Sequence, residues 1–535
     1  MTHLKGFGLE NFRVFKKNTW FDFAPITIFT GTNSSGKSSI NKALLLLINN
    51  VKTMFPNADL KFNEDANHLL GSQKYIRNDN DKNFGFTFSY NELGTNFILS
   101  IEYTNDSNYK DSRNSKIKSI NIIEKQTNIT VYRCTFDYSH STYETNAGLQ
   151  AYESLSVGFY MNFNYIITKF YKIKKHDGYD FDQPLYTIKF YEQIFDFEID
   201  EILLKSIISI ELDVLSNTII TGMPYRDTYD ILNEYEGCIT GRYMWDDNEN
   251  LEFNPFFNNL IHELNKRGYK TNGQEFQYNF LSDIESENLR LFFKNIYREL
   301  VCVHFKDVHS ILLNTDYLPS NRSSQIRINN MLNQNKAYYK LISDFQDDTK
   351  DKNTRRIDFI DKWLSEFELK IVIEDIAGVG YVVKNNYNKS NINLADEGYG
   401  YSQLLPIIMC VLNEKQKIII IEEPETNLHP ALQSKLADMF IEASKLFNIQ
   451  FVIETHSEYI IRRLQYLTAK KEIKSVDTII HYLFNPESEH AKQTGEQLRT
   501  IRIKEDGRLD KEFGTGFFDE STKLIESIWN ARSLN

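Results

Sequence analysis

The chain has 535 residues, of which 41% are hydrophobic, and this length predicts about three domains rather than one small core. Its formal net charge is −12 at pH 7, which excludes a protein that coats nucleic acid with its whole surface but leaves room for a local basic groove. The four cysteines form no C-x-x-C pair, and no apolar run reaches the roughly 18 residues of a membrane span, so we expect free thiols, no zinc site and no membrane span.

The N-terminal segment shows the alternation of apolar and polar residues that is typical of short strands, most clearly at residues 4–9 and 19–23. Basic residues such as Arg13 and Lys17 interrupt any apolar leader, so we expect no signal peptide and a cytoplasmic protein. The apolar run 26–30 indicates a buried strand.

A phosphate-binding pattern follows this strand. Residues 31–39, with the sequence GTNSSGKSS, fit G-x-x-x-x-G-K-[ST], and a helical stretch continues to residue 47. Glycines let the backbone approach a polyphosphate, and the helix N-terminus adds a favourable potential for negative charge. Lys37 is expected to reach the β and γ phosphates, and Ser38 to place a hydroxyl on magnesium. The predicted nucleotide contacts are Gly31, Asn33, Ser34, Ser35, Gly36, Lys37, Ser38 and Ser39.

The middle of the chain changes character. Antiparallel strands are expected between residues 84 and 137, most clearly at 84–88, 97–101 and 130–134. From about residue 141 to 305 the chain is rich in tyrosine, asparagine and acidic residues and shows helical periodicity, for example at 256–264 and 289–300. We therefore predict a mainly helical insertion between two lobes, with domains at 1–140, 141–310 and 311–535.

Helical periodicity returns after the insertion and ends with a helix at 357–367, and a hairpin is expected from 370–373 to 380–383. Helix and strand patterns alternate in the last third of the chain. The apolar runs 417–421 and 449–453 suit central parallel strands that are buried on both faces. The alternation predicts an α/β fold.

Acidic residues end the first of these runs, in the sequence IIIIEEPE at 418–425. A buried strand delivers such carboxylates to the edge of the sheet where α/β proteins bind ligands. We assign Glu422 to magnesium and Glu423 to the general base that polarises the attacking water. The alternative is a helix N-terminus whose acidic residues only complement the helix dipole; the phosphate loop favours the catalytic interpretation.

A histidine follows the second run, in the sequence ETHS at 454–457. Just past a central strand, a histidine can donate a hydrogen bond to a γ-phosphate or to the attacking water. A lone histidine is more often structural, but its place at the end of a sheet strand favours a functional role for His456.

The segment 394–406 combines two glycines, a serine and an apolar run, and indicates a loop that opens a helix. Its N–H groups and hydroxyl can bind a phosphate. Taken alone, the segment is better interpreted as a glycine turn that caps the helix.

Taken in order, these motifs resemble the ABC-type ATPase heads of the SMC, Rad50, RecF and OLD proteins. The resemblance covers 1–140 and 310–535 and rests on an opening strand at 9–15, Walker A at 31–38, a signature position at 398–403, Walker B at 418–423, a D-loop at 427–430 and the switch histidine His456. The signature segment is not the LSGGQ of transporters, and Glu422 stands where aspartate is usual. Residues 317–322 resemble a Tyr-x-x-x-x-Arg stretch of bacterial relatives, and 514–520 resemble the tail of one bacterial subfamily.

The resemblance implies an ABC-type P-loop ATPase head, with a mixed central sheet, N-terminal antiparallel strands and the mainly helical insertion. In such heads two chains enclose two ATP molecules, and Walker A of one chain faces the signature motif of the other. The chain is therefore expected to bind ATP and Mg²⁺ as a homodimer or a higher even oligomer, with Gly400 and Ser402 acting in trans.

OLD nucleases carry a Toprim domain after the ATPase, but no acidic E-G-x-x-D/E cluster follows Ser457, and no HNH or PD-(D/E)xK arrangement is convincing. The compact ATPases of Septu anti-phage systems, which work beside a separate HNH nuclease, are similar in architecture. This likeness implies an ATPase that dimerises on nucleotide and regulates a partner nuclease in bacterial defence, with DNA bound through the complex and no membrane partner.

Two alternatives stay open. A DNA-repair or chromosome-maintenance ATPase of the RecF or Rad50 type would clamp DNA directly, although the chain has no coiled-coil arms and no overall basic charge. A nucleotide-gated scaffold would bind ATP with little turnover. Salt-dependent DNA binding and phosphate release separate the three hypotheses.

Overall fold

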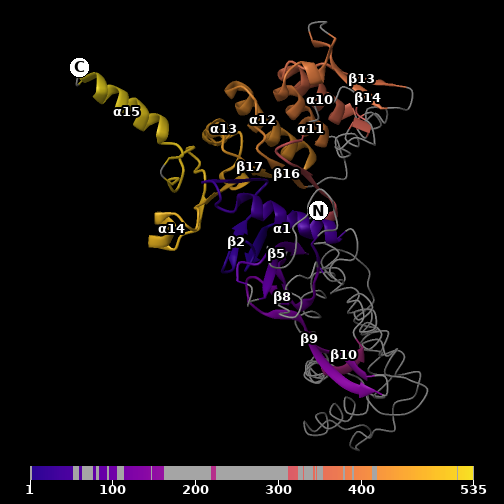
Figure 1. The fold of residues 1–535 in the computed structure, drawn as a ribbon. Coiled ribbons are helices and arrows are strands. Elements are labelled where there is room, and N and C mark those ends of the chain that lie inside the picture. Colours follow the sequence, from indigo (N-terminus) through magenta and orange to yellow (C-terminus); the bar gives the residue numbers. More distant parts are fainter. Residues whose placement is uncertain are drawn as a thin grey trace, which may run out of the picture.

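Two large sheets and the helices around them make up the described part of the chain (Figure 1). In the computed structural model the described residues are 3–51, 60–62, 76–79, 83–92, 95–104, 114–145, 148–161, 219–224, 311–322, 354–376, 380–387, 391–411, 418–514 and 516–533, together with 329, 342, 343 and 345. No helix within these ranges is both long and apolar enough to cross a membrane.

The central sheet has six strands. In spatial order they are β12 (Thr315–Leu318), β16 (Ile418–Glu422), β17 (Gln450–Glu454), β3 (Ile26–Gly31), β18 (Thr478–Leu483) and β19 (Leu498–Ile501). The neighbouring pairs are parallel except for β18 and β19, which are antiparallel. The strands expected at 26–30, 417–421 and 449–453 are thus confirmed, and their near-continuous apolar character reflects burial on both faces.

The register of this sheet aligns the carboxyl ends of three strands. Glu422 of β16 lies opposite Glu454 of β17, and Glu454 lies opposite Phe29 of β3. The acidic residues and the loop that follows β3 therefore meet at one edge of the sheet.

A second, antiparallel sheet has eight strands. In spatial order they are β11 (Ile219–Pro224), β10 (Gly148–Met161), β9 (Thr130–Thr145), β8 (Ile117–Glu124), β6 (Thr95–Tyr103), β5 (Phe84–Glu92), β1 (Gly6–Glu10) and β2 (Thr19–Asp22). A short pair, β4 (Leu60–Lys61) and β7 (Asn114–Ser115), accompanies it. Aromatic contacts join the two large sheets, since the rings of Phe21 in β2 and Phe29 in β3 are 5.5 Å apart. The predicted N-terminal antiparallel strands are confirmed.

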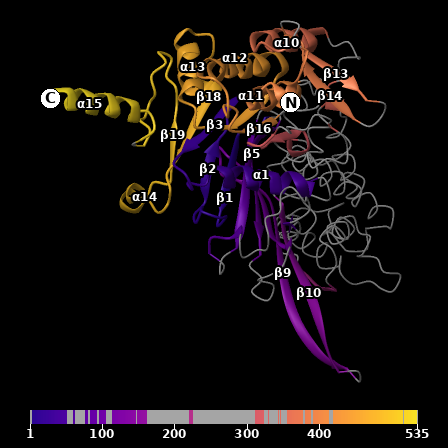
Figure 2. The same cartoon turned by 45° about the horizontal axis from the view of Figure 1, so that its top comes forward.

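The β9–β10 hairpin corrects the predicted boundary between the first two domains. Its strands pair continuously from Tyr132 to Thr145, so a boundary at residue 140 falls inside β9, and the hairpin extends away from the body (Figures 1 and 2). The described parts of the predicted insertion are strands rather than helices. The predicted boundary rests on a change in amino-acid composition near residue 141. Strand pairing runs through backbone hydrogen bonds, so the pairing can continue across such a change. The helices expected at 256–264 and 289–300 lie outside the described residues.

Helices cover both faces of the central sheet. The helix α1 (Lys37–Val51) lies between the two large sheets, and α11 (Tyr399–Cys410), α12 (Pro430–Phe447) and α13 (Glu458–Ala469) lie on the opposite face (Figures 1 and 2). The remaining elements are α10 (Thr354–Glu366), β13 (Ile371–Asp375), β14 (Tyr381–Asn385), β15 (Ile392–Asn393), η4 (Leu394–Asp396), η5 (Ser475–Asp477), α14 (Glu489–Thr494) and α15 (Glu520–Ser533). The helix ending near residue 367 and the hairpin of β13 and β14 agree with prediction.

Local sequence explains why these helices begin where they do. His429 caps α12 by accepting a hydrogen bond from the Ala431 N–H, with Pro430 at the first helical position. Ser457 caps α13 by accepting from the Ile460 N–H. Both caps follow strands of the central sheet, so they fix how the chain leaves the edge where the acidic residues lie.

The core beneath that edge is apolar and closely packed. Phe451 of β17 is fully buried, and its ring lies 4.9 Å from the ring of Phe440 in α12. This contact fixes α12 on the sheet and, with it, the strand that carries Glu454.

Replacing Phe451 with alanine should lower the free energy of unfolding by about 3–5 kcal/mol, because it leaves a cavity between β17 and α12. The control is Val476→Ala, since Val476 is 67% exposed and loses no buried contact. Thermal or urea unfolding of the two variants checks this; equal shifts would contradict the packing described for β17.

Candidate functional site

The phosphate loop lies between β3 and α1, as predicted, and it requires glycine at two positions. Gly31 has a φ of +135°, and a Cβ there would lie 2.1 Å from the Leu483 carbonyl oxygen. Gly36 has a φ of +107°, and a Cβ there would lie 2.5 Å from Val14 Cγ2. Ser34 is also left-handed, with a φ of +58°. Such alternation turns successive N–H groups toward one side of a loop, which is the geometry that binds anions.

The predicted contact residues differ in exposure. Asn33, Ser34 and Ser38 are exposed, whereas Ser35 and Ser39 are buried. The Ser35 hydroxyl has no hydrogen-bond partner among the described residues, so a ligand oxygen in the loop would supply one.

Lys37 lies inside the loop that it serves. Its Nζ donates to the carbonyl oxygens of Gly31 at 3.2 Å and Thr32 at 2.9 Å, and the residue is 6% exposed. Burial lowers the pKa of Lys37, while the charges of Glu454 and Glu423 oppose that shift. The ammonium is therefore held at the sheet edge by carbonyls that a phosphate can replace.

A pair of carboxylates faces the first turn of α1. Ser38 Oγ donates to Glu454 Oε1 at 3.0 Å. Asn41 Nδ2 donates to Glu454 Oε2 at 2.8 Å and to Glu422 Oε1 at 3.3 Å. Burial and the charge of Glu422 raise the pKa of Glu454 to about 7, so the two carboxyl groups share one small, poorly solvated space.

This donor set fits a magnesium ion. The residues predicted to hold the metal, Ser38 and Glu422, lie together, and Glu454 adds a second carboxylate; all are hard oxygen donors, which Mg²⁺ prefers. Within the described residues no group of three or more His, Cys, Asp or Glu side chains is placed to hold a metal ion. In a nucleotide site, phosphate oxygens and water commonly complete the coordination of Mg²⁺.

Sequence reasoning missed Glu454 and Asn41. A signal for Glu454 was available, since Glu454 ends its strand just as Glu422 does and lies opposite it in the register. Asn41 lies within α1, where a single polar residue carries no distinct pattern.

The predicted base, Glu423, has an unusual backbone conformation. Its φ is +44°, its N–H donates to the Glu454 carbonyl at 2.7 Å, and its Oε2 accepts from Thr426 Oγ1 at 3.2 Å. A left-handed glutamate costs about 1–3 kcal/mol and persists only where the surroundings fix it. The backbone contact to Glu454 and the side-chain contact from Thr426 thus fix the direction of the carboxylate.

His456 belongs to the same cluster. Burial and the charge of Lys37 lower its pKa, and the charge of Glu423 raises it, so these three residues lie within electrostatic reach of one another. The His456 N–H donates to Glu425 Oε1 at 2.7 Å, which fixes the start of the loop after β17. Lys37 follows β3, Glu423 follows β16 and His456 follows β17, so the register of the sheet places all three at the same edge. Their joint action on a nucleotide stays a prediction.

The two predicted residues of the signature segment, Gly400 and Ser402, make different contacts within the chain. A Cβ on Gly400 would lie 2.5 Å from the Asn427 carbonyl oxygen, so glycine here lets α11 approach the D-loop. Ser402 is 3% exposed, and its hydroxyl donates to the Leu394 carbonyl at 3.0 Å. That hydroxyl already has an acceptor within its own chain, and the action of Gly400 and Ser402 in trans stays a prediction. Gly398, at the N-cap position before α11, is the exposed glycine of this segment and provides no side-chain cap.

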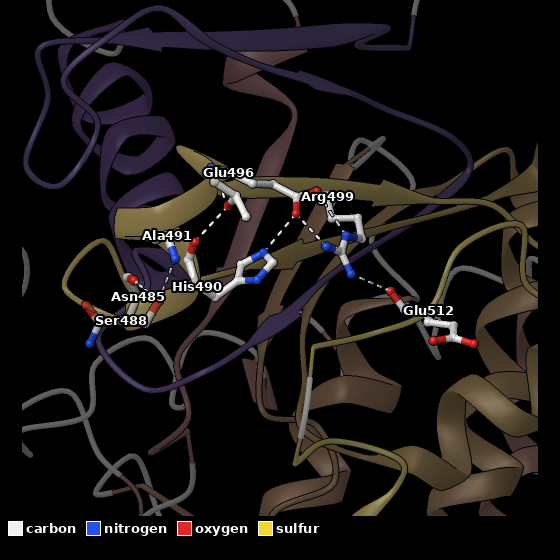
Figure 3. A network of polar contacts seen from close by, with 8 residues as sticks. Asn485, Ser488, His490, Ala491, Glu496, Arg499 and Glu512 are labelled. Carbon is white, nitrogen blue, oxygen red and sulfur yellow. Dashed lines mark hydrogen bonds and ion pairs between the residues drawn. The ribbon is translucent and has the colours of Figure 1, made fainter.

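Residues after β18 brace the other side of the phosphate loop. The Asn485 N–H donates to Thr32 Oγ1 at 3.0 Å, and its side chain donates to the Asn33 carbonyl at 3.4 Å. A polar network continues outward from Asn485 along α14 and β19 (Figure 3). In it, Glu496 accepts from Arg499 and pairs with His490 at 2.9 Å. The position of the loop thus depends on the C-terminal segment.

Comparisons with known proteins give the family of the chain. A family model described as AAA ATPase domain matches residues 3–461, and a model described as Protein of unknown function (DUF3696) matches residues 473–528. Endonuclease GajA of Bacillus cereus (strain HuB5-5) is 23% identical over 229 residues, which cover 37% of this chain and 33% of that protein. The chain therefore spans about a third of the length of that relative.

Solved structures that match include the SMC head domain from Thermotoga maritima, with 10% identity and a TM-score of 0.32 over 90% of this chain and 95% of that one. The SMC head domain of Pyrococcus yayanosii has 12% identity and a TM-score of 0.33 over 95% of this chain and 98% of that one. The predicted α/β fold of a P-loop ATPase is confirmed by the sheet order and by the AAA ATPase domain match alone.

The raised pKa of Glu454 predicts a pH-dependent effect of Glu454→Gln. Folding raises this pKa from 4.5 to about 7, so the folded chain binds the proton more tightly, and stability is lost as pH rises through that window. Without metal, the variant should be more stable than wild type at pH 8 by on the order of 1–3 kcal/mol, and equally stable at pH 5. Thermal unfolding at both pH values measures this, with Glu458→Gln as control; parallel pH profiles would contradict it.

Proposed function

The chain belongs to the AAA ATPase domain family, and from this premise we propose that it hydrolyses ATP with magnesium between two copies of itself and thereby controls a separate nuclease in bacterial defence against phage. The observation that carries the proposal is the convergence of the phosphate loop, the carboxylates of Glu422, Glu423 and Glu454, and His456 at one sheet edge.

Each residue of the cluster has a chemical role in this proposal. Lys37 exchanges its loop carbonyls for phosphate oxygens and stabilises the charge that develops there. Ser38, Glu422 and Glu454 hold magnesium, which neutralises phosphate charge when it is bound. Glu423 accepts the proton of the attacking water, and the lowered pKa of His456 keeps its imidazole neutral, ready to donate one hydrogen bond.

A second copy of the chain would complete the site. The N-terminus of α11 begins at the exposed Gly398 and has no side-chain cap, so its N–H groups are free to meet a phosphate of the partner copy. Gly400 brings the D-loop next to this turn. A phosphate bound between the copies holds them together only until it is hydrolysed, which makes the dimer a nucleotide-dependent switch.

The nuclease part of the proposal has narrower support. The curated relative is named an endonuclease, and the shared stretch covers a third of it, so cleavage is proposed for a partner chain that this ATPase regulates. The comparisons bring GajA rather than a Septu ATPase, and the closer likeness to Septu stays a prediction. DNA would be bound through the complex.

Glu423→Gln should bind ATP with an affinity close to wild type and hydrolyse it about 10²–10⁴-fold more slowly, because the amide cannot accept the proton of water. The slow step should also preserve the dimer, so light scattering with ATP should report twice the mass of one chain. Phosphate release and binding of a fluorescent ATP analogue give the two constants, with Glu505→Gln, at an exposed position, as control. Unchanged turnover would remove Glu423 from its role.

Lys37→Ala should abolish nucleotide binding, because the loop loses the only side-chain cation that the structure places within it, among the residues described. Lys42→Ala is the matched control, since Lys42 lies exposed on the same helix. Titration with a fluorescent ATP analogue measures the loss.

The role in phage defence is tested with the same two variants. Cells that carry the native locus with Lys42→Ala should reduce phage plating, and cells that carry it with Lys37→Ala should not. Equal plating on the two would argue for another cellular role.

A further inference from the structure

The buried guanidinium of Arg322 connects two parts of the nucleotide site that are far apart in the sequence. Arg322 is 3% exposed and lies just after β12, the edge strand beside β16. Its Nε donates to the Gln403 carbonyl in α11 at 2.9 Å. Its two terminal nitrogens donate to the Glu422 carbonyl at 2.7 Å and to the Glu423 carbonyl at 2.9 Å. A fourth bond, of 3.1 Å, goes to the Pro319 carbonyl.

All four acceptors are backbone oxygens, although carboxylates lie nearby. Burial lowers the pKa of Arg322 to about 10, against the opposing charges of Glu425 and Glu423, so the group is charged at neutral pH. A planar guanidinium donates in fixed directions. The group therefore fixes the positions of its acceptors relative to one another, rather than forming a simple ion pair.

One side of this connection is the backbone of the proposed base. Glu423 is left-handed, with a φ of +44°, and its N–H is already bound to the Glu454 carbonyl. Arg322 binds the carbonyl of the same residue. With both backbone groups bound, the strained conformation that directs the Glu423 carboxylate is held from two sides.

The other side is the first part of α11. Pro406 lies inside this helix and removes one helical N–H, and in the same region the Gln403 carbonyl accepts from Arg322. The turn before it contains Gly400, which contacts the D-loop backbone. This is the end of α11 that is proposed to meet the nucleotide of the partner copy.

We propose that Arg322 is a positioning residue that makes the start of α11 and the base Glu423 move as one unit. When α11 of one chain contacts the nucleotide bound by the partner copy, Arg322 then positions Glu423 of that same chain for hydrolysis. This inference rests on the two-chain arrangement of the proposed function. The guanidinium of Arg322 donates to backbone carbonyls, including that of Glu423, so its effect on hydrolysis passes through the backbone of the base.

The chain offers a matched control in Arg356. This arginine is 9% exposed, donates to the Val411 carbonyl at 2.5 Å, and lies over the Phe447 ring at 4.6 Å. It thus holds the opposite end of α11 through a backbone carbonyl, as Arg322 holds the start. A purely structural role predicts similar effects for the two arginines.

The test compares Arg322→Lys with Arg356→Lys in the full chain. Lysine keeps the positive charge but lacks the planar guanidinium that donates in several fixed directions. Thermal unfolding, ATP-analogue affinity, mass by light scattering in ATP, and turnover per chain are measured over a range of protein concentrations. Arg322→Lys should bind ATP and dimerise within about threefold of wild type, with turnover lower by on the order of 10²-fold and no rise with concentration, because the base is misplaced. In Arg356→Lys, turnover per chain should rise with protein concentration as it does in wild type.

The outcomes are distinct. Equal turnover in Arg322→Lys and wild type, or equal losses in the two lysine variants, overturns the inference while the proposed function stands. A wild-type turnover that is independent of concentration, with no dimer in ATP, overturns both.

A second measurement does not depend on the folding of Arg322→Lys. Hydrogen exchange of Glu423→Gln, with and without ATP, should show protection rising together in residues 399–405 and 421–427, and unchanged exchange near Val411. Protection of only one of the first two segments contradicts the inference.

Discussion

The structure depends on one constraint: three neighbouring parallel strands end at the same edge of one sheet, and each delivers charge there. The register places Glu422 opposite Glu454, and Glu454 opposite the end of β3. Adjacent strands are only about 4.8 Å apart, so the side chains of Glu422 and Glu454 start from neighbouring positions, and Asn41 donates to both. Ser38 and Asn41 donate to them from α1, and this is why the phosphate loop, the proposed metal ligands and the proposed base lie together.

The residues that could be predicted from sequence are those whose signal is local. Lys37 and Ser38 belong to a contiguous pattern, and Glu423 and His456 each follow an apolar run. Arg322 stands within a recognisable stretch, but its contacts reach residues 81 and 100 positions away. No local pattern encodes such contacts, so its role could only be inferred from the fold.

Long-range pairing also explains what the sequence analysis did not anticipate in the C-terminal segment. β18 pairs with β3 up to Gly31, and Asn485 binds the loop that follows. No strand was predicted at β18 or β19, and the pairing of β18 with residues 26–31 joins positions too far apart for a local pattern to show. In the fold they extend the sheet beside the phosphate loop, so the segment matched by the model of unknown function is part of the site's framework.

The balance of charge at the sheet edge argues for magnesium and nucleotide acting together. Four carboxyl groups gather there, those of Glu422, Glu423, Glu425 and Glu454, and their cations are Lys37 and Arg322. Burial raises the pKa of Glu425, and burial with the charge of Glu422 raises the pKa of Glu454 to about 7, so the closely placed carboxylates disfavour each other's ionised form. Free ATP would add negative charge to this cluster, whereas a divalent cation held by Glu422 and Glu454 would reduce the repulsion between them. The crowding of these carboxylates is therefore a physical reason for the proposed site to take nucleotide together with a divalent cation.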